Sequence, residues 1–308
     1  MNNILFINHK EHQCGVYQYG KRTSDILKKS DKYNFIYVEI ESEEEFNEEV
    51  ILYNPKQIIY NWHPSTLPWI DNDFLSKHPE IIHYALHHEG SKLFNFNYHL
   101  ILDSTFSDTN TDFSIPRPLF EDINFEYKKP DIPIISSFGF GIGDKGFALL
   151  VKTVNDQFDK ALIRLHIPFG YYGDREKQSI KSVYPGCYNE MYKPDIKLEI
   201  TNDFLETNQL LKFLSGSTIN AFFYPEMKGR GLSSVIDYAL SVNRPIAITK
   251  SDMFRHIYNT SPSICIEDRS IPEIIESGVL HDQYREKWSH INLINKYDSI
   301  LLSEYNTR

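Results

Sequence analysis

Short apolar runs alternate with longer amphipathic stretches from one end of the chain to the other. Strands that are buried on both faces read as continuous apolar runs, whereas helices on the surface of a sheet read as amphipathic stretches. This alternation is typical of parallel strands whose two faces are covered by helices. The fold class predicted from the chain is therefore α/β.

The first half of the chain supplies one set of these elements. Helices are expected over residues 16–29 and over part of 66–78. The glutamate-rich segment 39–49 is interpreted as the solvated face of a helix rather than as a ligand site. Strands are expected at Ile4–Asn8, Phe35–Glu39, Gln57–Asn61, Ile81–Leu86 and Leu100–Asp103.

The stretch FEYKKPDIPIISS interrupts this alternation, which restarts with a new apolar run at 132–137. We therefore place a domain boundary near residue 128, with an N-terminal domain over 1–128 and a C-terminal domain over 129–280. Residues 281–308 are expected to form a terminal helix, and its packing against the N-terminal domain stays open. Further strands are expected at 161–167, 196–200, 219–224, 245–249 and 263–266, and further helices at 146–158, 206–215, 234–242 and 271–277.

Charge and cysteine content argue against several kinds of partner. The formal net charge is −10, and no basic cluster is longer than a pair such as Lys28-Lys29, which disfavours a nucleic-acid partner. The three cysteines are far apart without a CxxC spacing, so neither a zinc site nor a disulfide framework is indicated. No apolar run has the roughly 20 residues that cross a bilayer, and the N-terminus lacks a signal-peptide pattern, so we expect a cytoplasmic protein. Loose association with a membrane face stays open.

A glycine-rich turn lies between an expected strand and an expected helix, in ISSFGFGIGDKGFALLVKTV. Gly139, Gly141, Gly143 and Gly146 would let backbone N–H groups approach a ligand closely, and Lys145 would add a movable positive charge. The spacing is not the dinucleotide pattern GxGxxG. Tight turns also use glycine for conformational reasons alone, so the functional and the structural interpretation both stay open.

A second turn of this kind lies in FYPEMKGRGLSSVIDYALSVNRPIAIT. Gly229 and Gly231 free the loop, and Arg230 between them is expected to bind a diphosphate bidentately. Ser233 or Ser234 is suited to cap the following helix, and Ser234 together with Asp237 also fits a capping box in its acidic form. Two such turns in one half of the chain favour a nucleotide diphosphate over a lone phosphate.

The order of these patterns resembles that of the GT-B glycosyltransferases, specifically the retaining group called family 4. In that family a strand ending in Gly-Arg, four further residues and Lys-Gly open the C-terminal domain. Here Gly139 and Lys145-Gly146 match this spacing, while Phe140 stands at the arginine position. The resemblance implies two Rossmann-like domains whose parallel sheets face an interdomain cleft.

The family's second signature is Glu-Gly-Phe-Gly, with another Glu eight residues after the first. The segment GRGL at 229–232 matches its glycines, but Lys228 and Ile236 stand at the two glutamate positions. The resemblance implies that Asp237, one place later, or Glu226 binds the ribose or sugar hydroxyls instead.

The first domain resembles the family in its strand ends. The stretch CGVYQYGKR resembles the Gly-Gly-Val loop near the donor phosphates, with Gly15 on the second glycine. The stretches NWHPSTLPW and YALHHEGS resemble strand ends that bear histidines, with His87 on the family's strand-end histidine. His87 is thus expected to contact the transferred sugar, and His63 and His88 are candidates for sugar or acceptor contact. No HExxH or comparable spacing joins the histidines, so a metal site is not predicted.

These resemblances imply transfer of a sugar from a nucleotide-diphosphate donor to a hydroxyl acceptor, without metal or cofactor and with retention of configuration. The acceptor is expected to be a glycan or a lipid-linked glycan, as in bacterial surface-polysaccharide assembly. Two alternatives stay open: a non-catalytic GT-B-like protein that binds a nucleotide or glycan, and a nucleotide-sugar epimerase. The residues assigned to catalysis are His87, Lys145 and Arg230. Those assigned to the donor are Gly15, Gly139, Gly141, Lys145, Glu226, Gly229, Arg230, Gly231, Leu232, Ser233, Ser234 and Asp237.

Overall fold

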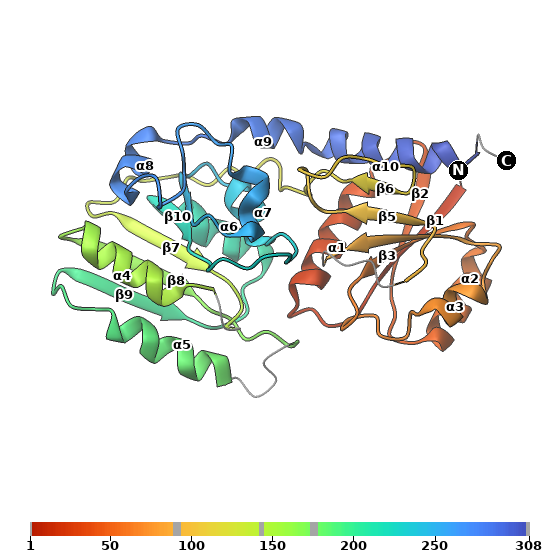
Figure 1. Ribbon diagram of the computed structural model, residues 1–308, viewed down its shortest axis with the longest axis horizontal. Helices are drawn as coiled ribbons and strands as arrows, with labels where there is room; N and C mark the ends of the chain where they lie inside the picture. The colour runs from red at the N-terminus through yellow and green to blue at the C-terminus, as the bar shows by residue number, and fades with distance from the viewer. Residues whose placement is uncertain (1, 89–93, 142–144, 173–177, 306–308) are drawn as a thin grey trace. The chain divides into compact units, whose positions relative to one another are not determined.

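Two sheets of parallel strands divide the chain into two units (Figure 1). The computed structural model describes residues 2–88, 94–141, 145–172 and 178–305. Unit 1 runs to Pro118 and resumes at Lys287, whereas unit 2 spans Leu119–Glu286. The expected boundary near residue 128 falls inside unit 2, and the segment 281–308 is shared between the two units.

Unit 1 is built on a six-stranded sheet in which every pair of neighbours is parallel. From edge to edge the strands are β2 (Tyr33–Glu39), β1 (Asn2–Asn8), β3 (Gln57–Trp62), β4 (Ile82–His87), β5 (Tyr98–Ile101) and β6 (Asp112–Ser114). Strand β1 sends Ile4 and Phe6 into one hydrophobic cluster and Leu5 and Ile7 into another. Both faces of the sheet are therefore covered, as the continuous apolar run of β1 indicates.

Helices fill these two clusters from opposite faces of the sheet. The first cluster receives α1 (Gly15–Leu27) and α10 (His290–Tyr305), and the second receives α2 (Glu43–Tyr53) and α3 (Asn72–Ser76). Two of the helices begin at side-chain caps. Ser42 Oγ accepts a hydrogen bond from the N–H of Glu45 at 3.2 Å, and Asp71 Oδ1 accepts one from the N–H of Phe74 at 2.8 Å.

Helix α10 returns to unit 1 from the far end of the chain. It packs beside α1, and Ser30 Oγ donates to Asp298 Oδ1 at 2.9 Å. Leu293, Tyr297 and Leu301 enter the same hydrophobic cluster as α1. At 16 residues α10 is still too short to span a bilayer, and no helix among the described residues is both long and apolar enough to do so.

Unit 2 is built on a five-stranded parallel sheet. Its strands, in spatial order, are β11 (Ile246–Ile248), β10 (Ile219–Phe222), β7 (Ile134–Phe138), β8 (Ala161–His166) and β9 (Ile196–Thr201). Its helices are α4 (Phe147–Gln157), α5 (Gln178–Asn189), α6 (Thr207–Ser215), α7 (Val235–Ser241), the 3-10 helix η1 (Asp252–Ile257) and α8 (Ile271–Ser277), after which α9 (Asp282–Lys287) leaves the unit. Helices α4 and α5 lie side by side (Figure 1). The predicted parallel α/β class is confirmed.

A few elements differ from the expected ones. The sequence does not predict α5, because Pro185 and Gly186 lie inside it and both residue types disfavour a helix. The strand expected at 263–266 is wrong: this segment contributes only an isolated bridge from Cys265 to Ile248. Strand β6 has only three residues, two of them polar, and such a short segment carries no strand signal of its own.

Candidate functional site

Two loops of unit 2 leave neighbouring strands at the same edge of its sheet. The first loop, residues 139–146, follows β7, and the second loop, residues 223–234, follows β10, which pairs with β7 in parallel. The carboxyl ends of parallel strands meet at one edge of a sheet, so the topology brings these loops together. Ligands of open α/β sheets bind at this edge. The two loops therefore define the candidate site of unit 2.

Gly146 holds the first loop against the second. Its φ of 62° is a left-handed conformation that suits glycine. A Cβ atom at this position would lie 1.7 Å from the carbonyl oxygen of Phe223, closer than any side chain tolerates. Glycine is therefore required here, and it lets α4 begin directly beside the end of β10. The Lys-Gly pair noted in the sequence thus has a structural reason as well as a predicted functional one.

Lys145 is half-buried where the two loops meet. Its Nζ lies 4.4 Å from the centroid of the Tyr224 ring, which is a cation–π contact. A pocket of about 360 Å³ opens beside it, with walls from both loops, from the start of α4 and from α5. The lining includes Lys145, Phe147, Ser182, Val183, Phe223 and Pro225. The pocket thus combines mostly apolar walls with the side chain of one lysine.

Gly139 and Gly141 do not offer their N–H groups in the expected way. The N–H of Gly139 donates to the carbonyl of His166 at 3.1 Å, and that of Gly141 donates to the carbonyl of Pro168 at 3.0 Å. Both glycines are buried, and these bonds continue the β7–β8 pairing beyond the ends of the strands. The expectation that these amides approach a ligand is therefore corrected. Gly143 lies outside the described residues.

The second loop exposes its charged side chains. Glu226, Lys228, Gly229 and Arg230 are exposed, Gly231, Leu232 and Ser234 are half-buried, and Ser233 is buried. Gly229 has a φ of 75°, and a Cβ atom there would meet no atom within 4 Å. Glycine is therefore needed at this position for its conformation and not for space. The loop presents two cations and one carboxylate to solvent.

Helix η1 ties this exposed loop down. The Arg255 guanidinium donates from Nη1 to the carbonyl of Arg230 at 3.0 Å and to the carbonyl of Asp252 at 2.8 Å. The N–H of Ser233 donates to the carbonyl of Met253 at 3.1 Å. The main chain on both sides of Gly231 is thus held, while the side chain of Arg230 is exposed at the surface.

Asp237 and Ser234 differ from their expected roles. Asp237 is fully buried, at 0 % exposure, so its carboxylate does not face a ligand of the loop. The side chain of Ser234 makes no capping bond to α7, so the capping box is wrong as well. All seven residues of α7 are buried, which explains why the carboxylate of Asp237 is buried as well. Glu226 remains as the exposed carboxylate of the second loop.

Tyr224 and Arg255 belong to the site although the sequence patterns do not single them out. Tyr224 closes an apolar run after β10 and reads as an ordinary core residue, with 1 % exposure. In the structure its ring contacts Lys145, and its hydroxyl accepts a hydrogen bond from Ser233 Oγ at 3.4 Å. Arg255 lies 25 residues after Arg230, and no spacing rule links the two.

The three histidines of unit 1 assigned to the site, His63, His87 and His88, lie at the carboxyl ends of β3 and β4. His87 is buried, and its Nε2 lies 2.7 Å from Nδ1 of His99, so it links β4 to β5. His88 is half-buried, with Nε2 2.6 Å from Oδ1 of Asn61. Burial holds the pKa of His88 well below 6.5, so this imidazole is neutral at neutral pH.

Half-buried His63 accepts a hydrogen bond at Nδ1 from the N–H of Ser65 at 3.1 Å. Within the described ranges, no three His, Cys, Asp or Glu residues are grouped so that they could hold a metal ion.

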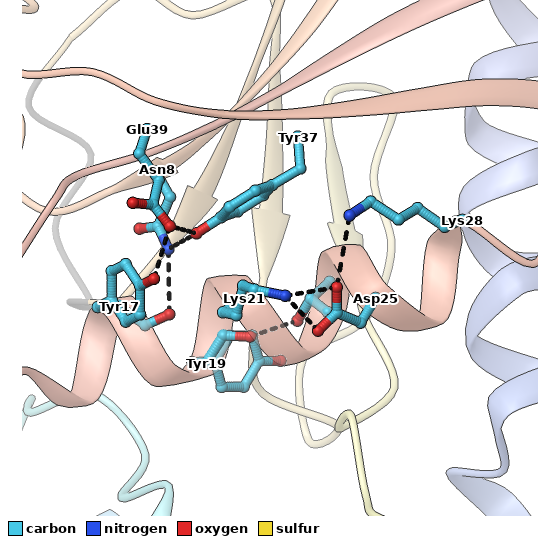
Figure 2. Close-up of polar contacts among 9 residues, drawn as sticks. Asn8, Tyr17, Tyr19, Lys21, Asp25, Lys28, Tyr37 and Glu39 are labelled. Atoms are coloured by element: carbon cyan, nitrogen blue, oxygen red, sulfur yellow. Dashed lines mark hydrogen bonds and ion pairs between the residues drawn. The ribbon is translucent and has the colours of Figure 1, made fainter. Parts of the chain in front are cut away.

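A partly buried polar network joins Asn8, Tyr17, Tyr37 and Glu39 near the start of α1 (Figure 2). Gly15 is the first residue of this helix. Asn8 Nδ2 donates to the carbonyl of Tyr17 and to the hydroxyl of Tyr37, both at 3.0 Å. Glu39 Oε1 accepts from the Tyr17 hydroxyl at 2.5 Å and from the Tyr37 hydroxyl at 2.9 Å. Burial is the main cause that raises the pKa of both phenols, and the Glu39 carboxylate raises both further. The network ties the ends of β1 and β2 to the first turn of α1.

Sequence comparison finds neither a family model nor a curated protein that matches the chain. Solved structures do resemble it. HepE from Anabaena in complex with UDP-glucose has a TM-score of 0.68 at 11% identity, over 98% of this chain and 100% of that one. Sucrose-phosphate synthase from Thermosynechococcus elongatus has a TM-score of 0.71 at 11% identity, over 100% of both chains. The lipopolysaccharide outer core galactosyltransferase WaaB has a TM-score of 0.62 at 12% identity, over 99% of this chain and 100% of that one. With its two sheets of parallel strands and interleaved helices, the chain therefore has the fold of these glycosyltransferases, the predicted GT-B fold.

Proposed function

We propose that the chain is a glycosyltransferase that moves a sugar from a nucleotide-diphosphate donor to a hydroxyl acceptor. The observation that carries the proposal is the place of Lys145, which lines a pocket with walls from both loops of unit 2 and whose ammonium lies 4.4 Å from the centroid of the Tyr224 ring. HepE, a protein of the same fold, has been solved with UDP-glucose. A pocket with mostly apolar walls and a lysine in its lining suits a nucleotide whose phosphates carry negative charge.

Lys145 and Arg230 are assigned to the diphosphate. As the bond between the sugar and the diphosphate breaks, negative charge grows on the leaving phosphate oxygen, and fixed cations stabilise that charge. Arg230 brings a planar guanidinium that binds phosphate bidentately, and η1 fixes its main chain. These two side chains supply the cationic stabilisation, so the proposed reaction needs no metal ion.

The acceptor hydroxyl attacks the anomeric carbon as the diphosphate leaves. We propose attack from the face that the diphosphate vacates, with the hydroxyl proton passing to a leaving phosphate oxygen, so that the configuration is retained. His63 and His88 are half-buried and keep their assignment to sugar or acceptor hydroxyls. His87 is buried against His99, so we assign it to the support of His88 rather than to direct contact. The acceptor is proposed to be a glycan or a lipid-linked glycan on the cytoplasmic side of a membrane.

One observation favours a second candidate, a protein of this fold that binds a nucleotide without transferring a sugar. Lys228 and Ile236 occupy the two glutamate positions, and Asp237 is buried rather than exposed. The second loop therefore offers Glu226 alone as an exposed carboxylate for the ribose. Turnover with an added acceptor separates a transferase from a binding protein. Interconversion of free nucleotide sugars without any acceptor would identify an epimerase.

The proposal is tested by titrating a panel of nucleoside diphosphates and nucleotide sugars against the purified chain. Ligand binding to the folded state raises the midpoint of thermal unfolding. We expect stabilisation by one nucleotide class in the wild type and its loss in Lys145→Ala and Arg230→Ala. Lys152→Ala is the matched control, because Lys152 lies on α4 but pairs with Asp156 at 2.9 Å and does not line the pocket. No shift with any member of the panel would overturn the proposal.

A further inference from the structure

Tyr224 contacts both loops of the candidate site from a buried position. The Nζ of Lys145 lies 4.4 Å from its ring centroid, and Ser233 Oγ donates to its hydroxyl at 3.4 Å. A Cβ atom at Gly139 would lie 3.5 Å from the same hydroxyl, so the main chain of the first loop passes close to it. One side chain thus contacts three residues that the sequence assigns to the donor.

The core of unit 2 holds Tyr224 itself in place. The ring of Phe254, in η1, lies 4.8 Å from it between centroids, at an interplanar angle of 49°. Thr249 Oγ1 donates to the main-chain carbonyl of Tyr224 at 2.5 Å. Ring and main chain are therefore both fixed, and the ring offers a rigid surface to Lys145.

Lys145 needs such a surface because a lysine side chain is flexible. Gly146 places the main chain next to Phe223, but four rotatable bonds separate that main chain from Nζ. An ammonium that already rests on an aromatic face loses less rotamer freedom when a phosphate binds it.

We propose that Tyr224 is a positioning residue for the donor diphosphate. Its ring holds the ammonium of Lys145 in place for the diphosphate. This inference rests on the proposed function, because it takes the diphosphate as the ligand of Lys145. It goes beyond that function by assigning the alignment of the cation to a residue that does not itself touch the ligand.

A double-mutant cycle tests the inference with UDP as the probe and uridine as its phosphate-free counterpart, by calorimetric titration. Tyr224→Leu removes the ring and Lys145→Met removes the ammonium. If Tyr224 acts through Lys145, we expect Tyr224→Leu to weaken the binding of UDP about fivefold when Lys145 is present. In the Lys145→Met background the same change should have no further effect on UDP binding. Uridine binding should change by less than about twofold, since uridine carries no phosphate for Lys145 to bind.

Two further variants separate positioning from simple loss of packing. Tyr224→Phe keeps the ring and should retain most of the UDP affinity that Tyr224→Leu loses. Phe222→Leu removes a fully buried aromatic ring that packs edge to face on Phe138 in the core of the same unit. It leaves Tyr224 and its neighbour Phe254 in place, and it should leave UDP affinity within about twofold of the wild type. Circular dichroism checks that each variant is folded.

The outcomes distinguish the inference from the function on which it rests. A wild type that binds neither UDP nor any other nucleotide diphosphate overturns the proposed function and this inference with it. A wild type that binds UDP, with Tyr224→Leu equally harmful in the presence and in the absence of the Lys145 ammonium, overturns the inference alone. If Tyr224→Leu weakens the binding of UDP and of uridine equally, the inference is likewise overturned while the proposed function stands.

Discussion

The guanidinium of Arg255 donates a hydrogen bond to the main-chain carbonyl of Arg230 at 3.0 Å, so that one arginine holds the backbone of another. Arg255 is half-buried in η1 and also donates to the carbonyl of Asp252 at 2.8 Å, whereas Arg230 is exposed. The second loop therefore keeps a defined course although its charged side chains are in solvent. A loop held in this way has less freedom to lose when a ligand binds.

Replacing Arg255 should therefore weaken nucleotide binding through the loop. For Arg255→Ala we expect about fivefold to tenfold weaker binding of the nucleotide found in the panel, equal to about 1 to 1.4 kcal/mol. Arg269→Ala is the matched control, because Arg269 also donates to two carbonyls, those of Ser263 and Glu273, but outside the second loop. Calorimetric titration measures both. Unchanged affinity in Arg255→Ala, or an equal loss in Arg269→Ala, would contradict the role of this bond.

Two glycines of the site should respond differently to alanine. Gly146→Ala places a Cβ 1.7 Å from the Phe223 carbonyl and also forces a left-handed conformation, so we expect a loss of more than about 3 kcal/mol in the free energy of unfolding of unit 2. Gly229→Ala meets no neighbour within 4 Å and should cost only the conformational term, about 1 kcal/mol. Urea unfolding followed by far-ultraviolet circular dichroism and by hydrogen exchange of β7 and β10 measures both. Equal losses of unfolding free energy in the two variants would show that the close approach of Gly146 to the Phe223 carbonyl does not contribute to stability.

The sequence predicts the strand, turn and helix that form the site, because each of them has a local sequence signal. The place of Lys145 and Gly146 between a strand and a helix follows from an apolar run, a glycine-rich turn and an amphipathic stretch. The contacts of Tyr224 do not follow from such signals. They exist because β10 lies beside β7 and because η1 packs beneath the loop, and both facts depend on the topology of unit 2.

Burial of single polar residues is also beyond the sequence patterns. Asp237 follows a loop of exposed charges, but its helix is so short and so completely covered that every face is an inner face. His87 stands at the end of β4 as expected, yet its partner His99 is set by the neighbouring strand β5, where the register places Ala85 opposite His99. Neither the burial of Asp237 nor the pairing of His87 with His99 can be predicted from the spacing of residues along the chain.

His83 should make unit 1 less stable in mild acid. Its Nδ1 lies 2.9 Å from the Tyr60 hydroxyl and its Nε2 lies 3.1 Å from the carbonyl of His78, which fits a neutral ring that accepts from Tyr60 and donates to His78. Burial lowers the pKa of His83 to about 4, against 6.5 for an unperturbed histidine, with a smaller opposing effect from the His78 carbonyl. Between pH 6.5 and 4 the unfolded chain therefore binds a proton that the folded chain does not. Stability contributed by the neutral ring is complete above pH 6.5 and is lost as the pH falls, by at most about 3 kcal/mol.

His83→Gln should flatten this pH dependence. All three tryptophans, Trp62, Trp69 and Trp288, belong to unit 1, so tryptophan fluorescence in urea reports the unfolding of this unit. We expect the wild type to lose more stability than His83→Gln between pH 7 and pH 5, whatever the difference between the two at pH 7. Parallel stability curves for the two proteins would show that another group is responsible.

The contact between Ser30 and Asp298 should decide how firmly α10 stays on unit 1. Asp298 is 2 % exposed, and its Oδ1 accepts from Ser30 Oγ at 2.9 Å, across the chain from the end of α1 to the last helix. Asp298→Ala leaves the buried Ser30 hydroxyl without this acceptor and should lower the free energy of unfolding of unit 1 by about 1 to 3 kcal/mol. Asp298→Asn keeps a carbonyl oxygen of the same shape and should cost less than Asp298→Ala. Tryptophan fluorescence in urea measures both, because Trp288 precedes α10 directly and the other two tryptophans lie in unit 1. If both variants unfold like the wild type, the buried hydrogen bond adds nothing to the apolar packing of α10, to which Leu293, Tyr297 and Leu301 contribute.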